Sequence, residues 1–385
     1  MKIGIAGPVT LKLLDIDFDN KMNIPVGYDF PLISMFINEL LKRDFEIVVY
    51  TTSVGIKQPI IYKRKKLKIC IGRRRDRHTA RDLFRLERKE LYNLMMSNPT
   101  DIINAQWTYE FAWASLDTGI PTLVTLRDHA ATIFRYQKDP YRIIRLFMNF
   151  IVLNRAKFLS ANSEYLYDKL STKNKKKTRI IPNFYQNELI KYPNNRIGKN
   201  GYILSVSNGF SRRKNVDTGL KAFSFIRKKY HDIEYHLVGD DMELGGPAYK
   251  YARNNGLTEG VIFIGKLGYN DVKDKIIKAK ILLHPALEES FGMVVLESMI
   301  LGTPVIGGNY SGNIPHLLGH GKNGVLCDVR NAIEIAKGIE KILGDCEISN
   351  TLTKNARLFA QNKYSNERLI EKYIGYYKHI KDEYA

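Results

Sequence analysis

Two glutamates, Glu289 and Glu297, stand eight positions apart in the stretch EESFGMVVLE, with Gly292 between them. The apolar residues 281–286 precede this stretch as a buried parallel strand would, and a helix is predicted to begin at Gly292. Ligands of a doubly wound sheet lie at the carboxyl ends of its strands, where a helix N-terminus offers N–H groups to a phosphate. Carboxylates accept hydrogen bonds from hydroxyls, so the spacing favours a nucleoside diphosphate sugar, with one carboxylate on the sugar and the other on the ribose.

A purely structural interpretation of the same stretch is also open. Glu289 would then stabilise the dipole of the helix that follows, and Glu297 would be a surface residue. Against this, Glu297 lies between Leu296 and Met299 in a strongly apolar helix, which is a poor place for a charge without a role.

The chain alternates short β-type runs with longer helical ones, a pattern typical of parallel sheets covered by helices on both faces. In the first half we predict strands at 2–6, 46–50, 102–105, 122–125 and 158–161, and helices at 30–42, 81–97, 109–118, 141–156 and 163–170. The stretch 183–201, rich in Asn, reads as a linker. The second half restarts the rhythm with strands at 202–207, 234–238, 261–264, 281–284 and 304–307, and helices at 215–230, 247–255, 270–278 and 292–301. The predicted fold class is therefore α/β, with two doubly wound domains of similar size that face each other across a cleft.

The 385 residues carry a formal net charge of +20, from 60 Lys and Arg against 40 Asp and Glu. Such an excess attracts phosphates, nucleic acid or an anionic membrane surface. The basic runs 73–81 and 173–179 lie in the first half, and each is equally compatible with a solvated surface. Three dispersed cysteines indicate no disulfide framework, and no run suggests a signal peptide or a membrane span, so we expect a cytoplasmic protein.

The longer stretch EESFGMVVLESMILGTPVI resembles the Glu-x7-Glu signature of retaining glycosyltransferases of the GT-B fold, in the large family 4 (glycosyl transferases group 1). The similarity continues through residues 181–183, 202–208, 212–217, 238–240, 263–266, 312–315 and 321–325, and so covers almost all of the second half. The first half resembles the family more loosely, through residues 101–108, 124–128 and 161–164. The resemblance implies two Rossmann-like domains: an acceptor-binding domain at 1–190 and a nucleotide-sugar-binding domain at 201–362, with a helix at 363–385 that crosses back to the first.

Carried onto this chain, the resemblance implies that Glu289 contacts the donor sugar near its reacting carbon, while Glu297 contacts the ribose. Lys214, with Arg212 or Arg213, would neutralise the diphosphate, which gains negative charge as its bond to the sugar breaks. The other implied donor-binding residues are Gly27, Asn208, Gly265, Lys266, Leu267, Ser290, Phe291, Gly292, Met293 and Val294. On the acceptor side the implied residues are Trp107, Tyr109, Arg127, Asp128 and His129. Asn208 stands where the family often has Arg, and Arg127 where His is frequent before the Asp.

The expected activity is transfer of a sugar from a nucleotide donor to a glycan or lipid-linked acceptor in bacterial surface polysaccharide synthesis, without metal or other cofactor. A GT-B-fold epimerase or phosphorylase is the alternative in another enzyme class, and a basic nucleic-acid-binding protein is the alternative outside enzymes. The chain lacks aromatics interleaved with its basic runs, which disfavours nucleic acid. His316 and His320 have a metal-like spacing, but Gly319 interrupts the helix and no third ligand is evident.

The predicted helix at 141–156 is amphipathic. Arg142, Arg145 and Asn149 fall on one side at helical spacing, and the other side carries Ile143, Ile144, Phe147, Phe150 and Ile151. Either this is a core helix with a wet polar face, or the first domain rests on the inner face of an anionic membrane as a peripheral protein.

Overall fold

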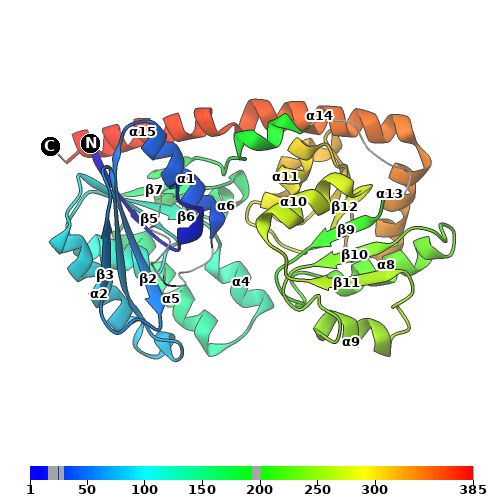
Figure 1. The fold of residues 1–385 in the computed structure, drawn as a ribbon, viewed down its shortest axis with the longest axis horizontal. Helices are drawn as coiled ribbons and strands as arrows, with labels where there is room; N and C mark the ends of the chain where they lie inside the picture. The colour runs from blue at the N-terminus through cyan, green and yellow to red at the C-terminus, as the bar shows by residue number, and fades with distance from the viewer. Residues whose placement is uncertain (16–24, 26–29, 193–200, 385) are drawn as a thin grey trace. The chain divides into compact units, whose positions relative to one another are not determined.

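The computed structural model describes residues 1–15, 25, 30–192 and 201–384, and the chain forms two compact units (Figure 1). The first unit combines Met1–Pro182 with Asn366–Ala385, and the second is Asn183–Ser365. The described part of the expected linker, residues 183–192, belongs to the second unit, where Asn187–Lys191 forms the short 3-10 helix η3.

Within the described residues, the sheet of the first unit has eight strands in the order β3-β4-β2-β1-β5-β6-β7-β8. Neighbouring strands are parallel except β3 and β4. The bounds are β1 (Lys2–Ala6), β2 (Glu46–Val54), β3 (Ile60–Lys63), β4 (Leu67–Arg74), β5 (Ile102–Gln106), β6 (Thr122–Leu126), β7 (Phe158–Ala161) and β8 (Thr178–Ile180). The five strands predicted in this half are confirmed as β1, β2, β5, β6 and β7. The prediction missed three strands: β3, which alternates between partly buried and exposed residues, β4, whose apolar residues are interrupted by Lys68, and the three-residue β8.

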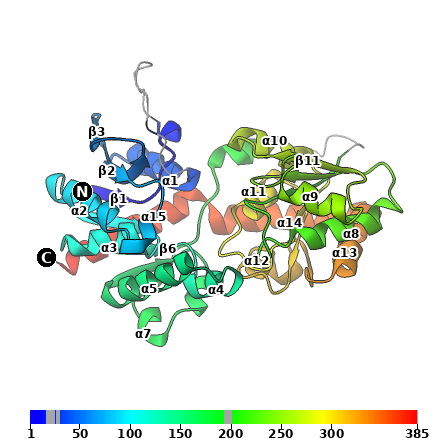
Figure 2. The ribbon, with the colours of Figure 1, turned by 90° about the horizontal axis from the view of Figure 1, so that it is seen from below.

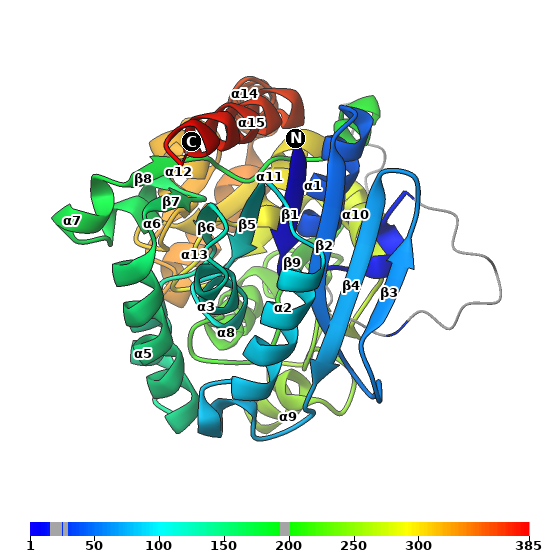
Figure 3. The same ribbon diagram turned by 90° about the vertical axis from the view of Figure 1, so that its left-hand side faces the viewer.

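The helices of the first unit cover both faces of this sheet. They are α1 (Pro31–Lys42), α2 (Arg85–Ser97), α3 (Glu110–Asp117), α4 (Ala130–Tyr136), α5 (Pro140–Arg155), α6 (Glu164–Asp168), α7 (Thr172–Lys175) and α15 (Asn366–Asp382), with 3-10 turns η1 (Leu11–Leu13) and η2 (Thr79–Asp82). Figure 2 shows α5 on the outside of the unit beside α4, and Figure 3 shows α1 and α15 on one face of the sheet with α2 and α3 on the other. The helix predicted from residue 81 begins only at Arg85, because Leu83 and Phe84 have left-handed backbone conformations that break it.

The second unit has a six-stranded sheet in its described residues, in the order β11-β10-β9-β12-β13-β14 with every neighbouring pair parallel. The strands are β9 (Ile203–Val206), β10 (Tyr235–Val238), β11 (Val261–Gly265), β12 (Ile281–His284), β13 (Val305–Gly308) and β14 (Val325–Cys327). The helices are α8 (Val216–Arg227), α9 (Pro247–Asn254), α10 (Tyr269–Lys278), α11 (Met293–Leu301), α12 (Ile314–Leu317), α13 (Ala332–Gly344) and α14 (Cys346–Tyr364), with the 3-10 turn η4 (Gly319–Gly321). In Figure 1, α10 and α11 lie on one face of this sheet, and α8 and α9 on the other. The elements predicted for this half are confirmed within a few residues, and only the final strand and the helices that follow β13 were not predicted.

In each sheet, successive strands are added on one side of a central pair and then on the other. In the first unit the chain leaves β1 toward β2 and β4, but leaves β5 toward β6, β7 and β8. In the second unit it leaves β9 toward β10 and β11, but leaves β12 toward β13 and β14. Loops that leave adjacent strands in opposite directions open a crevice at the carboxyl edge, and ligands of such sheets bind there. The fold therefore marks two crevices, one after β1 and β5 and one after β9 and β12.

Candidate functional site

The crevice of the second unit brings Lys214 and Glu289 together. Lys214 comes from the loop after β9 and Glu289 from the loop after β12, and Lys214 Nζ lies 3.1 Å from Glu289 Oε2. The side chain of Asn215 ties these loops down by donating to the carbonyl oxygens of Pro285 (2.9 Å) and Val329 (2.8 Å). Lys214 and Glu289, both predicted as site residues, are thus held together by the side chain of Asn215.

Glu289 remains ionised over a wide pH range. Burial by itself would raise its pKa, but Lys214, His284 and Arg213 outweigh that effect and lower the pKa to about 2. His284 Nε2 lies 3.8 Å from Glu289 Oε2, and burial lowers the pKa of His284 to about 4, so this ring is neutral near pH 7. The site therefore presents a partly exposed carboxylate whose negative charge is stabilised mainly by one lysine.

A second ion pair lies next to the first. Arg213 Nη1 is 3.3 Å from Glu288 Oε2 and 3.4 Å from the carbonyl oxygen of Glu288, whose side chain is only 3% exposed. Burial raises the pKa of Glu288, and Arg213 opposes that shift. The neighbouring Arg212 is exposed at the surface of the same loop. Of the two arginines proposed to assist Lys214, Arg213 is the one that the structure brings beside the glutamates.

The N-terminus of α11 forms the next wall of the crevice. Gly292 precedes the helix with φ +97°, a left-handed conformation, and a Cβ there would lie 2.8 Å from Ile314 Cδ1, so both backbone and space favour glycine. The first helical hydrogen bond runs from Leu296 N–H to Gly292 C=O at 3.0 Å, so the N–H groups just before Leu296 point out of the helix end. Phe291 is buried beside them, which fixes the start of α11. Ser290, Met293 and Val294, also predicted to bind the donor, are partly exposed along the same turn.

The segment Gly312-Asn313 fastens the loop that carries Glu289. The backbone N–H of Asn313 donates to the carbonyl oxygen of Glu289 at 2.9 Å, and its side chain donates to that of Phe291 at 3.1 Å. Gly312 has φ +61°, and any Cβ there would collide with the carbonyl oxygen of Glu289. These contacts give a physical reason for the sequence similarity that extends through residues 312–315.

Glu297, on α11, has different surroundings from Glu289. Tyr269 at the start of α10 donates its hydroxyl to Glu297 Oε1 at 3.3 Å. Burial raises the pKa of Glu297 to about 7, and the hydrogen bond from Tyr269 only partly opposes this. Glu297 therefore changes protonation near neutral pH, whereas Glu289 does not.

The remaining predicted donor residues lie in loops at the same carboxyl edge. Gly265, with φ +79°, ends β11 and its carbonyl oxygen accepts from Gly239 N–H at 2.9 Å, which joins the loops after β10 and β11. Lys266 is exposed, 3.6 Å from Asp240, and Leu267 follows it partly exposed. Asn208 is exposed in the loop after β9. Gly27, expected to approach the phosphates from the first unit, lies outside the described residues.

In the first unit, Trp107, Tyr109 and Asp128 come together after β5 and β6. Tyr109 is buried and donates its hydroxyl to Asp128 Oδ1 at 2.8 Å. Trp107 and Tyr109 line a cavity of about 230 Å³ with Pro8, Phe30, Glu110, Phe111, Tyr141 and Arg145. Arg127 and His129 are placed elsewhere: the buried Arg127 donates to Gln106 Oε1 at 2.9 Å, and His129 caps α4 through Thr132.

The side of α5 that carries Arg145 and Asn149 faces inward together with the buried Met148 and Val152, contrary to the expectation of a core helix with a wet polar face. Arg145 stacks on the ring of Tyr109 at 3.3 Å and donates to Glu110 Oε2 at 3.2 Å, and Asn149 accepts a hydrogen bond from Thr108 at 2.7 Å. The apolar residues Ile143, Phe147 and Phe150 are 54%, 50% and 65% exposed. The inversion is possible because Glu110 and the aromatic ring compensate the charge of Arg145.

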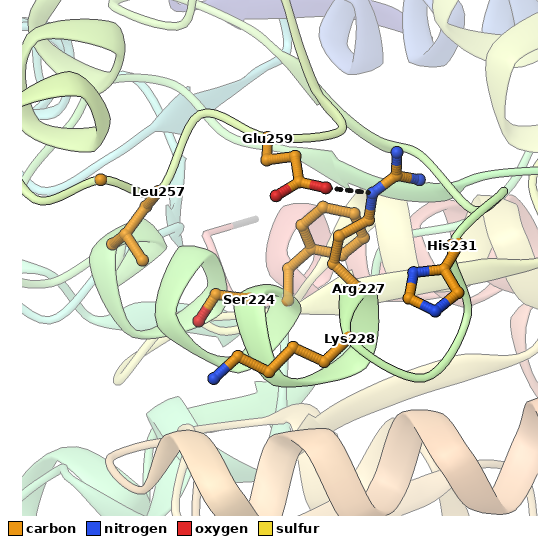
Figure 4. A pocket seen from close by; sticks show the side chains of 8 residues that line it. Ser224, Arg227, Lys228, His231, Leu257 and Glu259 are labelled. Atoms are coloured by element: carbon orange, nitrogen blue, oxygen red, sulfur yellow. Dashed lines mark hydrogen bonds and ion pairs between the residues drawn. The ribbon is translucent and has the colours of Figure 1, made fainter.

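Another pocket, of about 260 Å³, lies where α8 ends (Figure 4). In it Arg227 is paired with Glu259 at 3.4 Å and donates to the carbonyl oxygen of Ile233 at 3.0 Å. Because α8 begins beside Lys214 and ends here, this pocket lies at the opposite edge of the sheet from the two glutamates. Its basic residues include Lys228, which is exposed.

In the described ranges of the chain, no three His, Cys, Asp or Glu side chains are grouped as metal ligands would be, and the rings of His316 and His320 stand 5.1 Å apart. No helix in these ranges has both the length and the apolar character that crossing a membrane requires.

Several site residues escaped the sequence analysis. They are Tyr269, His284, Glu288 and Asn313 in the second unit and Glu110 and Arg145 in the first. His284 and Glu288 lie directly beside a predicted strand end and Glu289, so their position in the chain was an available signal. The partners of Tyr269 and Arg145 lie 28 and 35 residues away, and only the folded structure shows those contacts.

Two family models match adjacent parts of the chain. The model described as Glycosyltransferase Family 4 matches residues 33–188, and the model described as Glycosyl transferases group 1 matches residues 187–359. The chain belongs to the group 1 glycosyltransferases of family 4. This confirms the resemblance found in the sequence.

Individual proteins similar to this chain are also glycosyltransferases. An uncharacterized glycosyltransferase of Haemophilus influenzae is 31% identical over 185 residues, 48% of this chain and 51% of the relative. The lipopolysaccharide glucosyltransferase of Escherichia coli is 27% identical over 194 residues, 50% of each chain. The chain thus spans about half the length of the curated relatives it matches.

Solved structures match this chain over nearly its full length and theirs. Sucrose-phosphate synthase from Thermosynechococcus elongatus matches with a TM-score of 0.80 and 17% identity over 98% of each chain. Anabaena HepE in complex with UDP and glucose matches with a TM-score of 0.70 and 18% identity, over 98% of this chain and 100% of HepE. The predicted fold class, GT-B with two Rossmann-like domains, is confirmed.

Proposed function

We propose that this chain is a retaining glycosyltransferase that moves a sugar from a nucleoside diphosphate to a glycan or lipid-linked acceptor in bacterial surface polysaccharide synthesis. The observation that carries the proposal is the pair Lys214–Glu289, 3.1 Å apart beside the N-terminus of α11. The names of two relatives support the pathway: one is a lipopolysaccharide glucosyltransferase, and one is an uncharacterized 41.2 kDa protein in the cps region of Klebsiella pneumoniae.

The diphosphate would bind to three kinds of donor in the second unit. The N–H groups at the start of α11 offer a partial positive charge, and Lys214 and Arg213 add full charges. An ammonium has three N–H donors, so Lys214 can hold Glu289 and a phosphate oxygen together. Since the leaving diphosphate gains negative charge as the bond to the sugar breaks, these fixed donors stabilise the transition state more than the ground state.

Glu289 would act on the sugar, and Glu297 on the ribose. Positive charge develops at the anomeric carbon as the C–O bond to phosphate breaks, and the ionised carboxylate of Glu289 stabilises it. In a retaining reaction the acceptor oxygen enters on the face from which the diphosphate leaves, so the departing phosphate oxygen is the nearest base for the acceptor proton. Glu297 would accept hydrogen bonds from the ribose hydroxyls, remote from the bond that breaks.

A GT-B-fold epimerase would use the same donor site but needs no second substrate. Product analysis separates the two, because an epimerase returns a nucleotide sugar and a transferase releases the free nucleoside diphosphate. A nucleic-acid-binding protein would instead be retained on DNA in a salt-dependent way, with no effect of nucleoside diphosphate.

The direct test is thermal unfolding of the protein with UDP, GDP, CDP and dTDP. At a hundred times its dissociation constant the correct nucleotide should add about 2.7 kcal/mol of stability. Lys214→Ala should raise the dissociation constant of this nucleotide about tenfold or more, because a charge-assisted contact is lost. Lys228→Ala is the matched control, since Lys228 stands at the other end of α8. Equal binding to both variants, or no stabilisation of the native chain by any nucleotide, would contradict the proposal.

The inverted helix α5 supports an anionic lipid surface as the place where the first unit works. Its exposed stripe of Ile143, Phe147 and Phe150 offers apolar side chains for the interface between headgroups and acyl chains. Lys177 donates to the carbonyl oxygens of Leu153 and Ala156 at 2.6 Å each, which anchors the basic run 173–179 to the C-terminal end of α5. Cationic side chains at one end of an exposed apolar stripe complement acidic headgroups.

A further inference from the structure

The crevice of the first unit corresponds to the donor crevice of the second by topology, and the resemblance assigns Trp107 and Tyr109 to the acceptor without saying which chemical group they bind. Pro8 follows β1 and Trp107 follows β5, the two strands between which the chain reverses its direction across the sheet. Both residues line the cavity of about 230 Å³. The cavity therefore lies where a doubly wound sheet binds its ligand.

The cavity walls are mainly aromatic. Five rings line it, and the remaining side chains are one acid, one base and a proline: Phe30, Trp107, Tyr109, Phe111 and Tyr141, with Glu110, Arg145 and Pro8. Aromatic faces suit a ligand with an apolar face, and sites for whole drug-sized molecules are commonly about 300–1,000 Å³. The space therefore suits a single ring rather than an extended chain of rings.

The charged groups around the cavity already have partners within the protein. Arg145 is bound to Glu110 at 3.2 Å and stacked on Tyr109, and Tyr109 donates to Asp128 at 2.8 Å. One cation thus stands against two carboxylates, so an anionic ligand would gain little here. The same groups, held rigidly by one another, offer acceptors and donors to hydroxyls.

Trp107 stands in a conformation that bulky residues avoid. Its φ is +62°, and it is held there by a hydrogen bond from its N–H to Thr125 C=O (2.9 Å) and by an edge contact with Phe30 (4.7 Å between ring centroids). Such backbone conformations are unfavourable for residues with a side chain and concentrate at binding sites. A partly exposed tryptophan kept at this cost is explained by a ligand that stacks on it.

We infer that this cavity is the subsite for a neutral hexopyranose ring of the acceptor, which stacks on Trp107 while its hydroxyls meet Tyr109, Glu110 and Arg145. A sugar ring has the required combination of an apolar face and a hydroxylated rim. The inference rests on the proposed function, because it assigns the acceptor class to the same reaction.

The chain offers an internal reporter, since Trp107 and Trp113 are its two tryptophans. In the Trp113→Phe protein, Trp107 fluorescence should change saturably with methyl α-D-glucopyranoside, methyl α-D-mannopyranoside or methyl α-D-galactopyranoside. The matched Trp107→Phe protein, which keeps Trp113, should show no saturable change. An equal response in both proteins, or none with any glycoside up to its solubility, would overturn the inference. An equal response of Trp107 to n-octanol would also overturn it, because the cavity would then take an alkyl chain.

Nucleotide binding separates this inference from the function on which it rests. If UDP or GDP stabilises the Trp113→Phe protein and no glycoside binds, the inference fails and the transferase proposal stands. If glycosides bind and no nucleoside diphosphate does, the proposed function fails instead. With the donor identified, Trp107→Leu should raise the acceptor KM at least tenfold. A Trp107→Leu variant with an unaltered acceptor KM would count against the stacking role.

Discussion

The two crevices have the same origin in the topology and opposite chemistry. After β9 and β12, Lys214 and Arg213 stand against Glu289 and Glu288 at a helix N-terminus, and loops supply the backbone groups. After β1 and β5, aromatic rings enclose a space whose single cation is already paired. The fold thus supplies two positions for ligands, and we propose that the side chains at the strand ends suit one to a polyanion and the other to a neutral ring.

The largest expected effect on the donor crevice comes from substitution of Glu289. Glu289→Ala should lower kcat by about a hundredfold or more, because its charge stabilises the transition state beyond the ground state. Steady-state kinetics with the true donor measures this, and Glu259→Ala, on an exposed glutamate remote from the crevice, is the control. An unchanged kcat in folded Glu289→Ala protein would rule out the role assigned to this carboxylate.

Glu297 should separate binding from catalysis within the same crevice. Glu297→Ala should raise the donor KM by about ten- to a hundredfold, the loss of a charge-assisted hydrogen bond of about 1.5–3 kcal/mol, with little change in kcat. Tyr269→Phe removes only the hydroxyl that holds Glu297, so a smaller rise in KM is expected. If Glu297→Ala lost kcat while Glu289→Ala kept it, the two roles would be reversed.

The two glutamates should also give opposite pH dependence of stability. The pKa of Glu297 is raised by burial from 4.5 to about 7, so its contribution is complete below pH 4.5 and is lost as the pH rises through 7. The pKa of Glu289 is lowered to about 2, so its contribution is present above pH 4.5 and is lost as the pH falls through 2. Glu297→Gln should therefore reduce the fall in unfolding free energy between pH 5 and pH 8, by on the order of 2 kcal/mol. Urea unfolding at both pH values measures it, and an identical fall in the native chain and the variant would refute the expected shift.

The smallest effect concerns the outer surface of the first unit. Phe147→Ser with Phe150→Ser should reduce binding to anionic lipid vesicles by about tenfold, since two half-exposed rings no longer insert. Phe225→Ser, on an exposed ring of α8 in the second unit, should leave binding unchanged. Sedimentation with vesicles at low salt measures this partition. Equal binding of the native chain to neutral and anionic vesicles would contradict the proposal that the first unit works at an anionic lipid surface.

The sequence predicted the second unit better than the first for physical reasons. The donor crevice depends on residues close together in sequence, a strand end and a helix start, so 281–301 alone indicated Glu289, Gly292 and Glu297. The aromatic cavity depends on contacts between distant segments, such as Arg145 with Glu110, and the helical spacing of α5 suggested the wrong inward face. A periodic pattern shows that a helix has two sides, but a buried ion pair decides which side turns inward. The domain boundaries and the roles of the site residues stay predictions.

The last helix, α15, has a consequence for how the protein is made. It belongs to the first unit, where Tyr377 is buried and receives a hydrogen bond from Asn104 at 2.6 Å, yet it follows the whole of the second unit, Asn183–Ser365, in the chain. At a synthesis rate of about 5–20 residues per second, the ribosome needs roughly 10–40 s to reach it. During that interval the second unit is being made and one face of the first sheet lacks α15. The second unit is a continuous segment, so it is complete at Ser365, before α15 has been synthesised. The nascent chain is therefore expected to mature in the order second unit before first, the reverse of the usual N-terminal-first order, and to need protection of that open face until the final helix emerges.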